Sequence, residues 1–318
     1  MNKNIETGGR DRRTFLKEMT ALSGVSVLGG SPGKLMAQVA PNWKNQIGIE
    51  LYTVLDLLKK DYEGTLAQLA KIGYKEVEPA DPYNNMEPKQ YKALLDKYGL
   101  KMYSTHSGAT AGPGLEKQLE GQALMGIKYT DVSAPRAAAG AGTRPTRPAR
   151  TVESVKRSAE QMNKYGPIVK KFGMKILYHN HAGEFDLLEG GGRTQYDVLL
   201  AETDPSLVVM QLDIGWAAVA GQDILQMFKK SPGRYELWHV KDAAGKSLDP
   251  KATPSERQRA AKIVPMGEGD IDYKTIFANA KLAGMKYFVI EQDGAGRVSG
   301  DAIADCRVAY RNLHKILS

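Results

Sequence analysis

Short runs rich in β-branched and aromatic residues alternate with longer amphipathic segments from about residue 46 onward. Runs such as Leu207–Asp213 have the composition of buried strands, whereas Tyr62–Ile72 repeats its apolar residues every three or four positions, which predicts a helix. Regular alternation of this kind predicts a parallel sheet whose strands are joined by crossover helices. The expected strands are Gln46–Tyr52, Glu76–Glu78, Lys101–His106, Tyr129–Ser133, Lys175–His179, Leu207–Asp213, Tyr235–Val240 and Tyr287–Glu291. The expected helices are Tyr62–Ile72, Pro88–Tyr98, Gly114–Met125, Val152–Phe172, Thr194–Glu202, Ile224–Lys230, Tyr273–Ala283 and Ala302–Leu317.

Glycines mark several joints between the expected helices and the strands that follow them. The segments K-I-G-Y-K, K-Y-G-L-K, K-F-G-M-K and L-A-G-M-K each place Gly where a helix ends, because Gly adopts the left-handed C-cap conformation at little cost. An open doubly wound sheet would show the same alternation, but no G-x-G-x-x-G fingerprint follows the first strand. Eight strand–helix units without that fingerprint predict an α/β fold, a (β/α)8 TIM barrel, over residues 41–318.

The first 40 residues have the pattern of an export signal. The paired Arg12 and Arg13 precede Phe15 and Leu16, which matches a twin-arginine signal. The apolar stretch from residue 19 to residue 30 is too short and too rich in Gly and Ser to span a bilayer. We therefore expect residues 1–40 to direct export by the twin-arginine route, giving a periplasmic protein without a stable membrane span. A disordered basic tail is the alternative interpretation.

The charge of the chain gives little support for a nucleic-acid partner. The net charge is +8, but residues 1–40 hold six Lys or Arg against three Asp or Glu, so the remainder carries about +5. Cys306 is the single cysteine, which excludes an internal disulfide and a thiolate zinc cluster, and we expect it to be a buried thiol in the last helix.

Residue types that bind metals gather at the expected carboxyl ends of the strands. Four of the five histidines in the chain lie there, and side chains at these ends of a barrel converge on one mouth. Imidazole and carboxylate ligands without a thiolate suit a divalent ion such as Mn, Co, Zn, Fe or Mg, and an open coordination position would allow catalysis. The residues are His106, His179, His181, Glu184, Asp213, His239, Lys241, Asp242, Glu291 and Asp293.

Alternation within each strand indicates which of these side chains share one face. Residues two apart in a strand point the same way, so His239 and Lys241 share a face, as do Glu291 and Asp293. A site built from the fifth to the eighth strand is therefore geometrically possible. We expect the metal ligands to be His179, Asp213, His239 and Glu291, with His181 or Glu184 as the substitute if His179 points away.

At the level of motifs, the chain resembles the xylose-isomerase-like barrel family over roughly residues 46–317. The resemblance is carried by G-I-E-L-Y-T-V, Y-H-N-H-A-G-E-F, Q-L-D-I-G-W, W-H-V-K-D, M-G-E-G-D-I-D-Y and V-I-E-Q-D. The family includes sugar phosphate isomerases/epimerases, ketose 3-epimerases, inosose dehydratase and endonuclease IV-type enzymes. It implies a metal held by carboxylates from strands five and eight, an Asp from strand six and a His from strand seven.

Asp213, His239 and Glu291 match the ligand pattern that the resemblance implies. The fifth strand departs from it, because His179-Asn180-His181 stands where a Glu is common. In ketose epimerases of the family two metal-bound glutamates also move protons, and this chain lacks one of that pair. The departure leaves the fourth ligand and the chemistry open.

Other residues near the expected mouth have both a functional and a structural interpretation. Lys241 is expected to face the mouth, where its ammonium group would bind substrate and steady a developing enolate oxygen, although a surface charge is the alternative. Glu78 and His106 are candidate binders of substrate hydroxyl groups, and Trp216 is a candidate platform for a sugar ring or a packing residue of the rim. The Ala-, Gly-, Pro- and Arg-rich loop over residues 134–150 is interpreted as a lid or as a surface insertion.

The function predicted from these features is a divalent-metal-dependent isomerase or epimerase that acts on an unphosphorylated sugar or keto-sugar. The ion would polarise a carbonyl group, and His181, Glu184 or Glu291 would remove the neighbouring proton. Loss of a β-substituent instead would make the protein a lyase or hydratase of 3-keto-glycosides or inosose-type ketones. A non-catalytic carbohydrate-binding barrel is the alternative from another class, and a homo-oligomer is compatible with the sequence.

Overall fold

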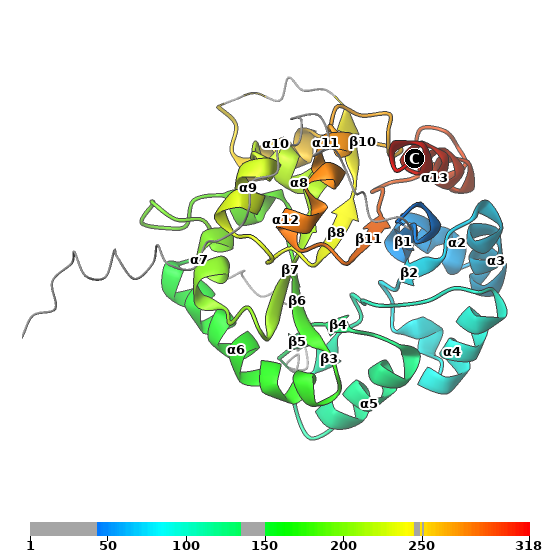
Figure 1. The fold of residues 1–318 in the computed structure, drawn as a ribbon, viewed down its shortest axis with the longest axis horizontal. Helices are drawn as coiled ribbons and strands as arrows, with labels where there is room; N and C mark the ends of the chain where they lie inside the picture. The colour runs from blue at the N-terminus through cyan, green and yellow to red at the C-terminus, as the bar shows by residue number, and fades with distance from the viewer. Residues whose placement is uncertain (1–42, 135–149, 245–248, 250) are drawn as a thin grey trace, which may run out of the picture. The chain divides into compact units, whose positions relative to one another are not determined.

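The strands of the protein form one curved parallel sheet in the computed structural model, which describes residues 43–134, 150–244, 249 and 251–318. Neighbouring strands are parallel and follow the order β2-β1-β11-β8-β7-β6-β4. Figure 1 shows this sheet surrounded by helices. The strands are β1 (Gly48–Glu50), β2 (Glu76–Glu78), β4 (Tyr129–Thr130), β6 (Lys175–His179), β7 (Val208–Asp213), β8 (Leu237–Val240) and β11 (Tyr287–Ile290).

The segment expected as the third strand closes the gap between β2 and β4. Parallel bridges join Glu76 to Lys101 and Ser104 to Tyr129, and the Tyr129 N–H donates to the Tyr103 carbonyl at 3.0 Å. The segment therefore completes a ring of eight, as its third position in chain order, although it forms two bridges and not a continuous strand. After Ser104 the chain leaves the ring and forms the short parallel pair β3 (Ala109–Thr110) and β5 (Val132–Ser133). The (β/α)8 barrel expected from the sequence is confirmed.

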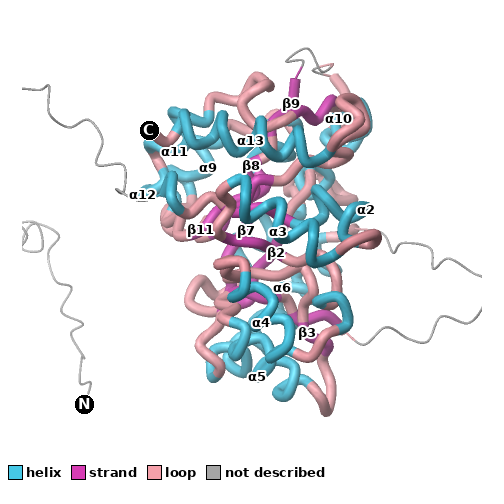
Figure 2. The backbone as a smooth tube through the Cα atoms, turned by 90° about the vertical axis from the view of Figure 1, so that its right-hand side faces the viewer, coloured by secondary structure: helices cyan, strands magenta, loops and turns pink. Residues whose placement is uncertain are grey.

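Helices pack outside the strands, as Figure 2 shows from a second direction. The long ones carry an apolar face into the space between helix and sheet, which the larger core cluster fills. Cys306 is buried in the last of them, as expected. The α-helices are α2 (Leu55–Leu58), α3 (Tyr62–Ile72), α4 (Pro88–Lys97), α5 (Leu115–Met125), α6 (Val152–Lys171), α7 (Gln195–Glu202), α8 (Ile214–Val219), α9 (Ile224–Lys230), α10 (Pro254–Ala260), α11 (Tyr273–Ala278), α12 (Ala280–Ala283) and α13 (Ala302–Ile316). The 3-10 turns are η1 (Trp43–Asn45), η2 (Leu51–Val54), η3 (Tyr83–Asn85) and η4 (Ala182–Phe185).

A small apolar layer inside the ring determines where the polar side chains lie. Tyr129, Leu177, Val209 and Leu237 form a separate buried cluster, one residue from each of four neighbouring strands. Because side chains alternate along a strand, the residues two positions further on face the same interior. Those residues include His179, Gln211 and His239, so the alternation itself lines the carboxyl end of the barrel with polar groups.

The hairpin β9 (Asp242–Ala244) and β10 (Lys262–Val264) follows β8 and is anchored by Asp242. One carboxylate oxygen of Asp242 accepts hydrogen bonds from the N–H groups of Gly267 and Gly269, both at 3.0 Å. A Cβ atom at Gly269 would lie 2.1 Å from the other oxygen, so only Gly allows this approach. The M-G-E-G-D-I-D-Y motif is thus held against the end of β8, next to the mouth.

The predicted export signal, residues 1–40, and most of the predicted lid, residues 135–149, lie outside the described residues. Within the described part, no helix combines the length and the apolar character that crossing a bilayer requires.

Candidate active site

Four side chains expected as metal ligands meet at the carboxyl end of the barrel. One ligand atom from each of His179, Asp213, His239 and Glu291 lies within 4.8 Å of the others, and all four residues are buried or nearly so. We call this group the mouth cluster. They come from β6, β7, β8 and the residue after β11, which are neighbouring positions of the ring. His106 approaches from the third position and forms a second group with His179 and His239.

Glu78 contacts two of the histidines, and its expected role as a substrate binder stays a prediction. Its Oε1 lies 2.9 Å from Nε2 of His106 and 2.8 Å from Nε2 of His239, and its Oε2 accepts hydrogen bonds from Ser104 and Gln211. Both oxygens are therefore used within the protein. A carboxylate behind a ligating imidazole fixes the orientation of the ring and raises its basicity. The rings of His106 and His239 are nearly parallel, with centroids 5.1 Å apart.

His239 lies between two carboxylates. Its Nδ1 is 2.6 Å from Oε2 of Glu291, opposite the contact of Nε2 with Glu78. Burial opposes a charged ring, but the Glu78 and Glu291 carboxylates raise the pKa of His239 well above its ordinary value. Binding of a metal ion at this ring would therefore displace a proton.

Two atoms of the mouth cluster are buried and form no hydrogen bond: Oδ2 of Asp213, which lies 3.0 Å from the Lys241 ammonium group, and Nδ1 of His179. The other Asp213 oxygen, Oδ1, accepts from the Trp216 N–H at 2.8 Å and caps α8, so Oδ2 points elsewhere. Burial, followed by the charges of His239 and His106, holds the pKa of His179 well below its ordinary value, and the ring stays neutral. A neutral imidazole and a carboxylate oxygen with free lone pairs are suitable ligands for a divalent ion. The donor set therefore fits a divalent metal.

Lys241 supplies a positive charge beside the mouth cluster. Its side chain is fully buried, and Nζ lies 3.0 Å from Asp213, 3.1 Å from Glu291 and 2.6 Å from Asp293. Burial alone would lower the pKa of Lys241, but these three carboxylates raise it, so the group remains an ammonium ion. Nζ also lies 4.7 Å from the ring centroid of Trp216.

The backbone beside Lys241 is fixed on two sides. Tyr273 of the M-G-E-G-D-I-D-Y motif donates its hydroxyl hydrogen to the Lys241 carbonyl at 2.6 Å. A Cβ atom at Gly215 would lie 2.5 Å from the same carbonyl oxygen, so the Gly of Q-L-D-I-G-W lets α8 pack against this strand end. Trp216, expected as a sugar platform, is 5% exposed and covers Lys241. Its role in substrate binding stays a prediction.

The sequence interpretation did not single out two residues of the site, Glu50 and Gln211. Glu50 ends β1 and is buried; its Oε2 accepts from the Tyr52 N–H at 2.7 Å, and its Oε1 has no hydrogen-bond partner. Burial and then the Glu291 charge raise the pKa of Glu50 to about 8. Gln211 donates to Glu78 at 2.7 Å and lies 3.0 Å from His106. Both are polar residues in otherwise apolar strands, at or near the carboxyl end, and that pattern could have identified them from the sequence.

His181 and Glu184, expected as bases, lie beside the mouth cluster. The exposed ring of His181 is 5.0 Å from that of His179 and 6.5 Å from that of Trp216. The Glu184 carboxylate accepts from the His181 N–H at 2.8 Å and lies 3.6 Å from the Arg150 guanidinium. The ring of His181 thus lies next to a residue of the cluster, whereas the contacts of Glu184 hold the η4 turn.

Two cavities flank the mouth cluster. The inner cavity, about 430 Å³, is lined by His106 and His179 together with Asp131, Ser133 and other residues of β5 and β6. The outer cavity, about 490 Å³, is lined by Arg150, His181, Gly183, Glu184, Asp186, Ser255 and Gln258. Both volumes fall within the range of roughly 300–1,000 Å³ that ligand pockets occupy.

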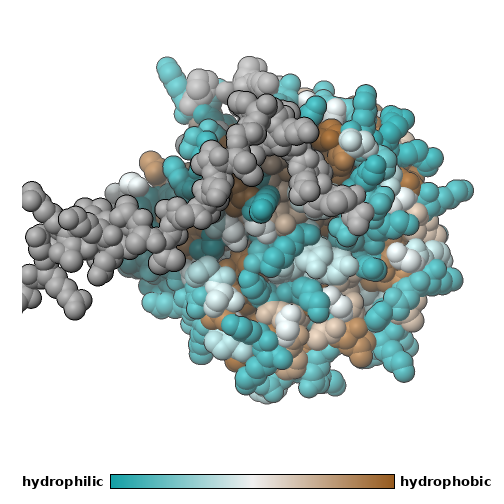
Figure 3. Space-filling view, viewed as in Figure 1, coloured by the Kyte–Doolittle hydropathy of each residue, from teal (hydrophilic) through white to brown (hydrophobic). Residues whose placement is uncertain are grey.

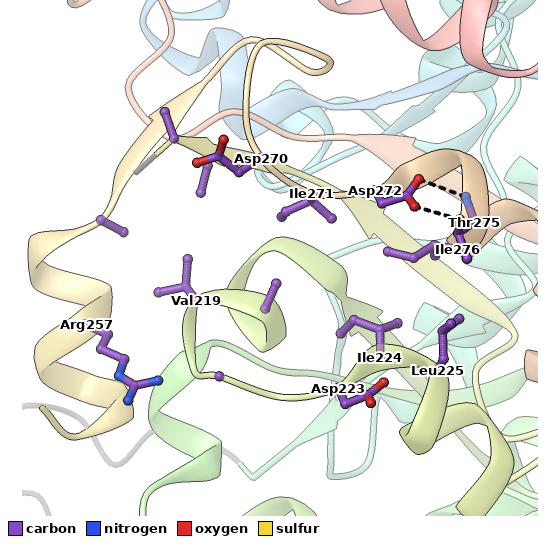
Figure 4. Close-up of a pocket in the computed structure, with 15 residues that line it drawn as sticks. Val219, Asp223, Ile224, Leu225, Arg257, Asp270, Ile271, Asp272, Thr275 and Ile276 are labelled. Atoms are coloured by element: carbon purple, nitrogen blue, oxygen red, sulfur yellow. Dashed lines mark hydrogen bonds between the residues drawn. The ribbon is translucent and has the colours of Figure 1, made fainter. Parts of the chain in front are cut away.

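A third cavity, about 430 Å³, lies among α8, α9, α11 and the β9–β10 hairpin (Figure 4). Val219, Ile224 and Ile276 give it an apolar wall, and its lining contains no residue of the mouth cluster. We therefore place the chemistry at the mouth rather than in this cavity. On the face in Figure 3 the apolar residues form small patches among hydrophilic ones.

The sequence of this barrel matches one protein-family model over most of its length. The model described as "Xylose isomerase-like TIM barrel" matches residues 66–308, which include every strand of the ring except β1. The chain belongs to the xylose isomerase-like TIM barrel family. The family expected from the sequence motifs is thus confirmed.

Proteins similar to this chain carry names from two reaction classes. An inosose dehydratase from Clostridium perfringens is 33% identical over 129 residues, which make up 39% of this chain and 42% of that protein. The alignment thus spans about two-fifths of that relative. A sugar phosphate isomerase/epimerase from Parabacteroides distasonis has a solved structure with a TM-score of 0.63 and 21% identity, covering 89% of this chain and 96% of that one. A family member from Mycobacterium smegmatis, solved in complex with magnesium, has a TM-score of 0.56 and 13% identity, covering 89% of this chain and 98% of that one.

Proposed function

We propose that the protein is a divalent-metal-dependent enzyme that removes the proton next to the carbonyl group of an unphosphorylated sugar ketone. One observation carries this proposal: four imidazole and carboxylate donors from neighbouring strands lie within 4.8 Å of one another at the mouth of a barrel of this family. Charged and polar groups with strongly shifted pKa values, gathered at the carboxyl end of a barrel, support a catalytic interpretation.

His179, Asp213, His239 and Glu291 are the residues that would hold the ion. Bound there, the ion supplies Lewis-acid polarisation of a carbonyl oxygen, which makes the neighbouring C–H group more acidic. Magnesium in the Mycobacterium smegmatis family member supports a divalent ion, and the two imidazoles of this cluster also suit Zn, Mn or Co.

The proton transfer is assigned to His181. Its ring is exposed toward the outer cavity and stands next to His179, so it can reach a carbon atom bound beside the mouth cluster. Glu291 is a poorer base: burial would raise its pKa, but Lys241 and His239 hold that pKa well below its ordinary value. The Lys241 ammonium group stabilises the negative charge that develops on the carbonyl oxygen when His181 takes the proton.

Two outcomes follow from the same proton abstraction. Return of the proton to the other face or to the neighbouring carbon gives an epimer or an isomer. Departure of a substituent on the β-carbon, with its electron pair and a proton, gives an unsaturated ketone together with water or an alcohol. The relatives named inosose dehydratase support elimination, and we propose that this second outcome is the one the enzyme uses.

Exchange with solvent tests this function directly. Protein loaded with Mn²⁺ or Zn²⁺ is incubated in D2O with an inosose, an unphosphorylated ketose and a 3-keto-glucoside. We expect loss of the proton signal next to the carbonyl of at least one of them and, for elimination, a new vinyl proton signal. Binding of a sugar ketone without exchange would instead support a non-catalytic carbohydrate-binding barrel.

We also propose that residues 1–40 direct export by the twin-arginine route to the periplasm. The paired Arg12 and Arg13 support this, and phosphorylated sugars are retained in the cytoplasm, which fits an unphosphorylated substrate. Replacing both arginines with Lys should keep the protein in the cytoplasmic fraction. An unchanged distribution between fractions would contradict the export proposal.

A further inference from the structure

The outer cavity beside the mouth cluster has a polar lining held together by its own hydrogen bonds. The Arg150 guanidinium donates to the Gly183 carbonyl at 3.0 Å, and the Ala182 N–H donates to the Gln258 side chain at 3.2 Å. Ser255 on α10 donates its hydroxyl hydrogen to Asp186 beyond η4. These contacts fix α10, the residue Arg150 and the η4 turn relative to one another, so the cavity is preformed.

His181 connects the outer cavity to the mouth cluster. It lines the cavity on one side, and on the other its ring lies 5.0 Å from that of His179. His106 and His179 also form part of the wall of the inner cavity. A molecule whose reacting carbonyl lies at the cluster and whose remote part passes His181 therefore enters the outer cavity.

The chemistry of the outer cavity suits hydroxyl groups rather than a phosphate. Two carboxylates, Glu184 and Asp186, face one guanidinium, and that guanidinium already contacts Glu184 and the Gly183 carbonyl. Among the lining residues that the structure describes, a phosphate would meet a net negative charge without a free cationic partner. Ser255, Gln258 and the two carboxylates offer both donors and acceptors, which match the hydroxyl groups of a sugar.

We propose that the outer cavity is a subsite for a second, uncharged glycosyl unit, so that the substrate is a keto-disaccharide rather than a free monosaccharide. This inference rests on the proposed function of the mouth cluster. It assigns α10 and η4 a role in specificity, because both lie outside the ring of strands that carries the chemistry.

Filling the cavity without removing a hydrogen bond tests the subsite. A Cβ atom at Gly183 would lie 3.0 Å from Ser255 Oγ and 3.6 Å from Arg150 Nη1, inside the cavity, and Gly183 has no positive φ. We expect Gly183→Ala to raise KM about tenfold for the 3-keto forms of cellobiose, sucrose or trehalose, with kcat unchanged, and to leave KM for 3-keto-glucose unchanged. In Gly114→Ala, the matched control, the new methyl group meets only the Gln118 amide, at 3.8 Å.

Binding of the unoxidised sugars separates this inference from the proposed function. Saturation-transfer NMR should detect at least one of cellobiose, sucrose and trehalose on wild-type protein and lose it in Gly183→Ala, even if no keto sugar reacts. Disaccharide binding that is lost in Gly183→Ala, together with no reaction of any keto sugar, would contradict the proposed chemistry and support the subsite. Equal kcat/KM for mono- and disaccharides, unchanged in Gly183→Ala, would overturn the subsite and leave the chemistry standing.

Discussion

The Asp213→Asn variant should lose both its metal and its activity, and it should be less stable than wild type because Lys241 loses one of its three carboxylate partners. Asn keeps an oxygen that can accept from the Trp216 N–H, so the cap of α8 survives. It replaces Oδ2, the buried oxygen that lies 3.0 Å from Lys241 Nζ, with an amide nitrogen that carries no charge and cannot serve as an anionic ligand. We expect the affinity for Mn²⁺ to fall at least about 100-fold and kcat/KM to fall about 1,000-fold. Calorimetric titration and the exchange assay in D2O measure the two effects.

Asp223→Asn is the matched control for this variant. Asp223 caps α9 in the same way, with Oδ1 accepting from the Gln226 N–H at 3.0 Å, but it is exposed and lies outside the mouth cluster. Metal affinity and activity should be unchanged in it. If Asp213→Asn retained wild-type affinity and rate, the mouth cluster would not be the metal site.

Replacing Lys241 with Met should have the second-largest effect, on stability as well as on activity. The substitution removes the buried ammonium group that neutralises Asp213, Glu291 and Asp293. Removing one partner of a buried ion pair costs about 3–5 kcal/mol, because the remaining charges stay unpaired. We expect a large fall in the melting temperature of metal-free protein, partly restored by Mn²⁺, and a fall in kcat of about 100-fold or more.

Lys286→Met controls for loss of a lysine from an ion pair. Lys286 contacts Glu236 at 2.9 Å, but its side chain is 54% exposed, so water screens the pair and the loss should stay under about 1 kcal/mol. Melting curves with and without Mn²⁺ give both comparisons. A Lys241→Met protein that melts and reacts like wild type would show that the ammonium group has no role at the mouth.

The fold followed from the sequence because apolar runs repeat eight times at strand–helix spacing and glycines mark four of the joints between helix and strand. The third strand was the exception: Lys101–His106 has a strand-like composition, yet it forms only two bridges. Its regularity ends at Ser104, whose hydroxyl group donates to Glu78 inside the barrel. The partner in this hydrogen bond is distant in the sequence, so the local pattern of residues does not reveal where the strand ends.

Only part of the candidate site could be predicted from the sequence. Alternation within strands was sufficient to expect that Asp213, His239 and Glu291 face one interior, and the structure brings them together. Alternation could not reveal that Glu78 contacts two histidines and Gln211, because those contacts join β2 to three other positions of the ring. The same rule, applied one step further down β7, would have identified Gln211 beside Asp213.

Crystals grown with Mn²⁺ and measured at the manganese edge would show whether the mouth cluster holds a metal ion. We predict one anomalous peak at the barrel mouth, within about 2.0–2.2 Å of a side-chain atom of each of His179, Asp213, His239 and Glu291. A peak elsewhere, or none in protein that binds sugar ketones and exchanges their protons, would contradict the metal site on which the proposed chemistry depends.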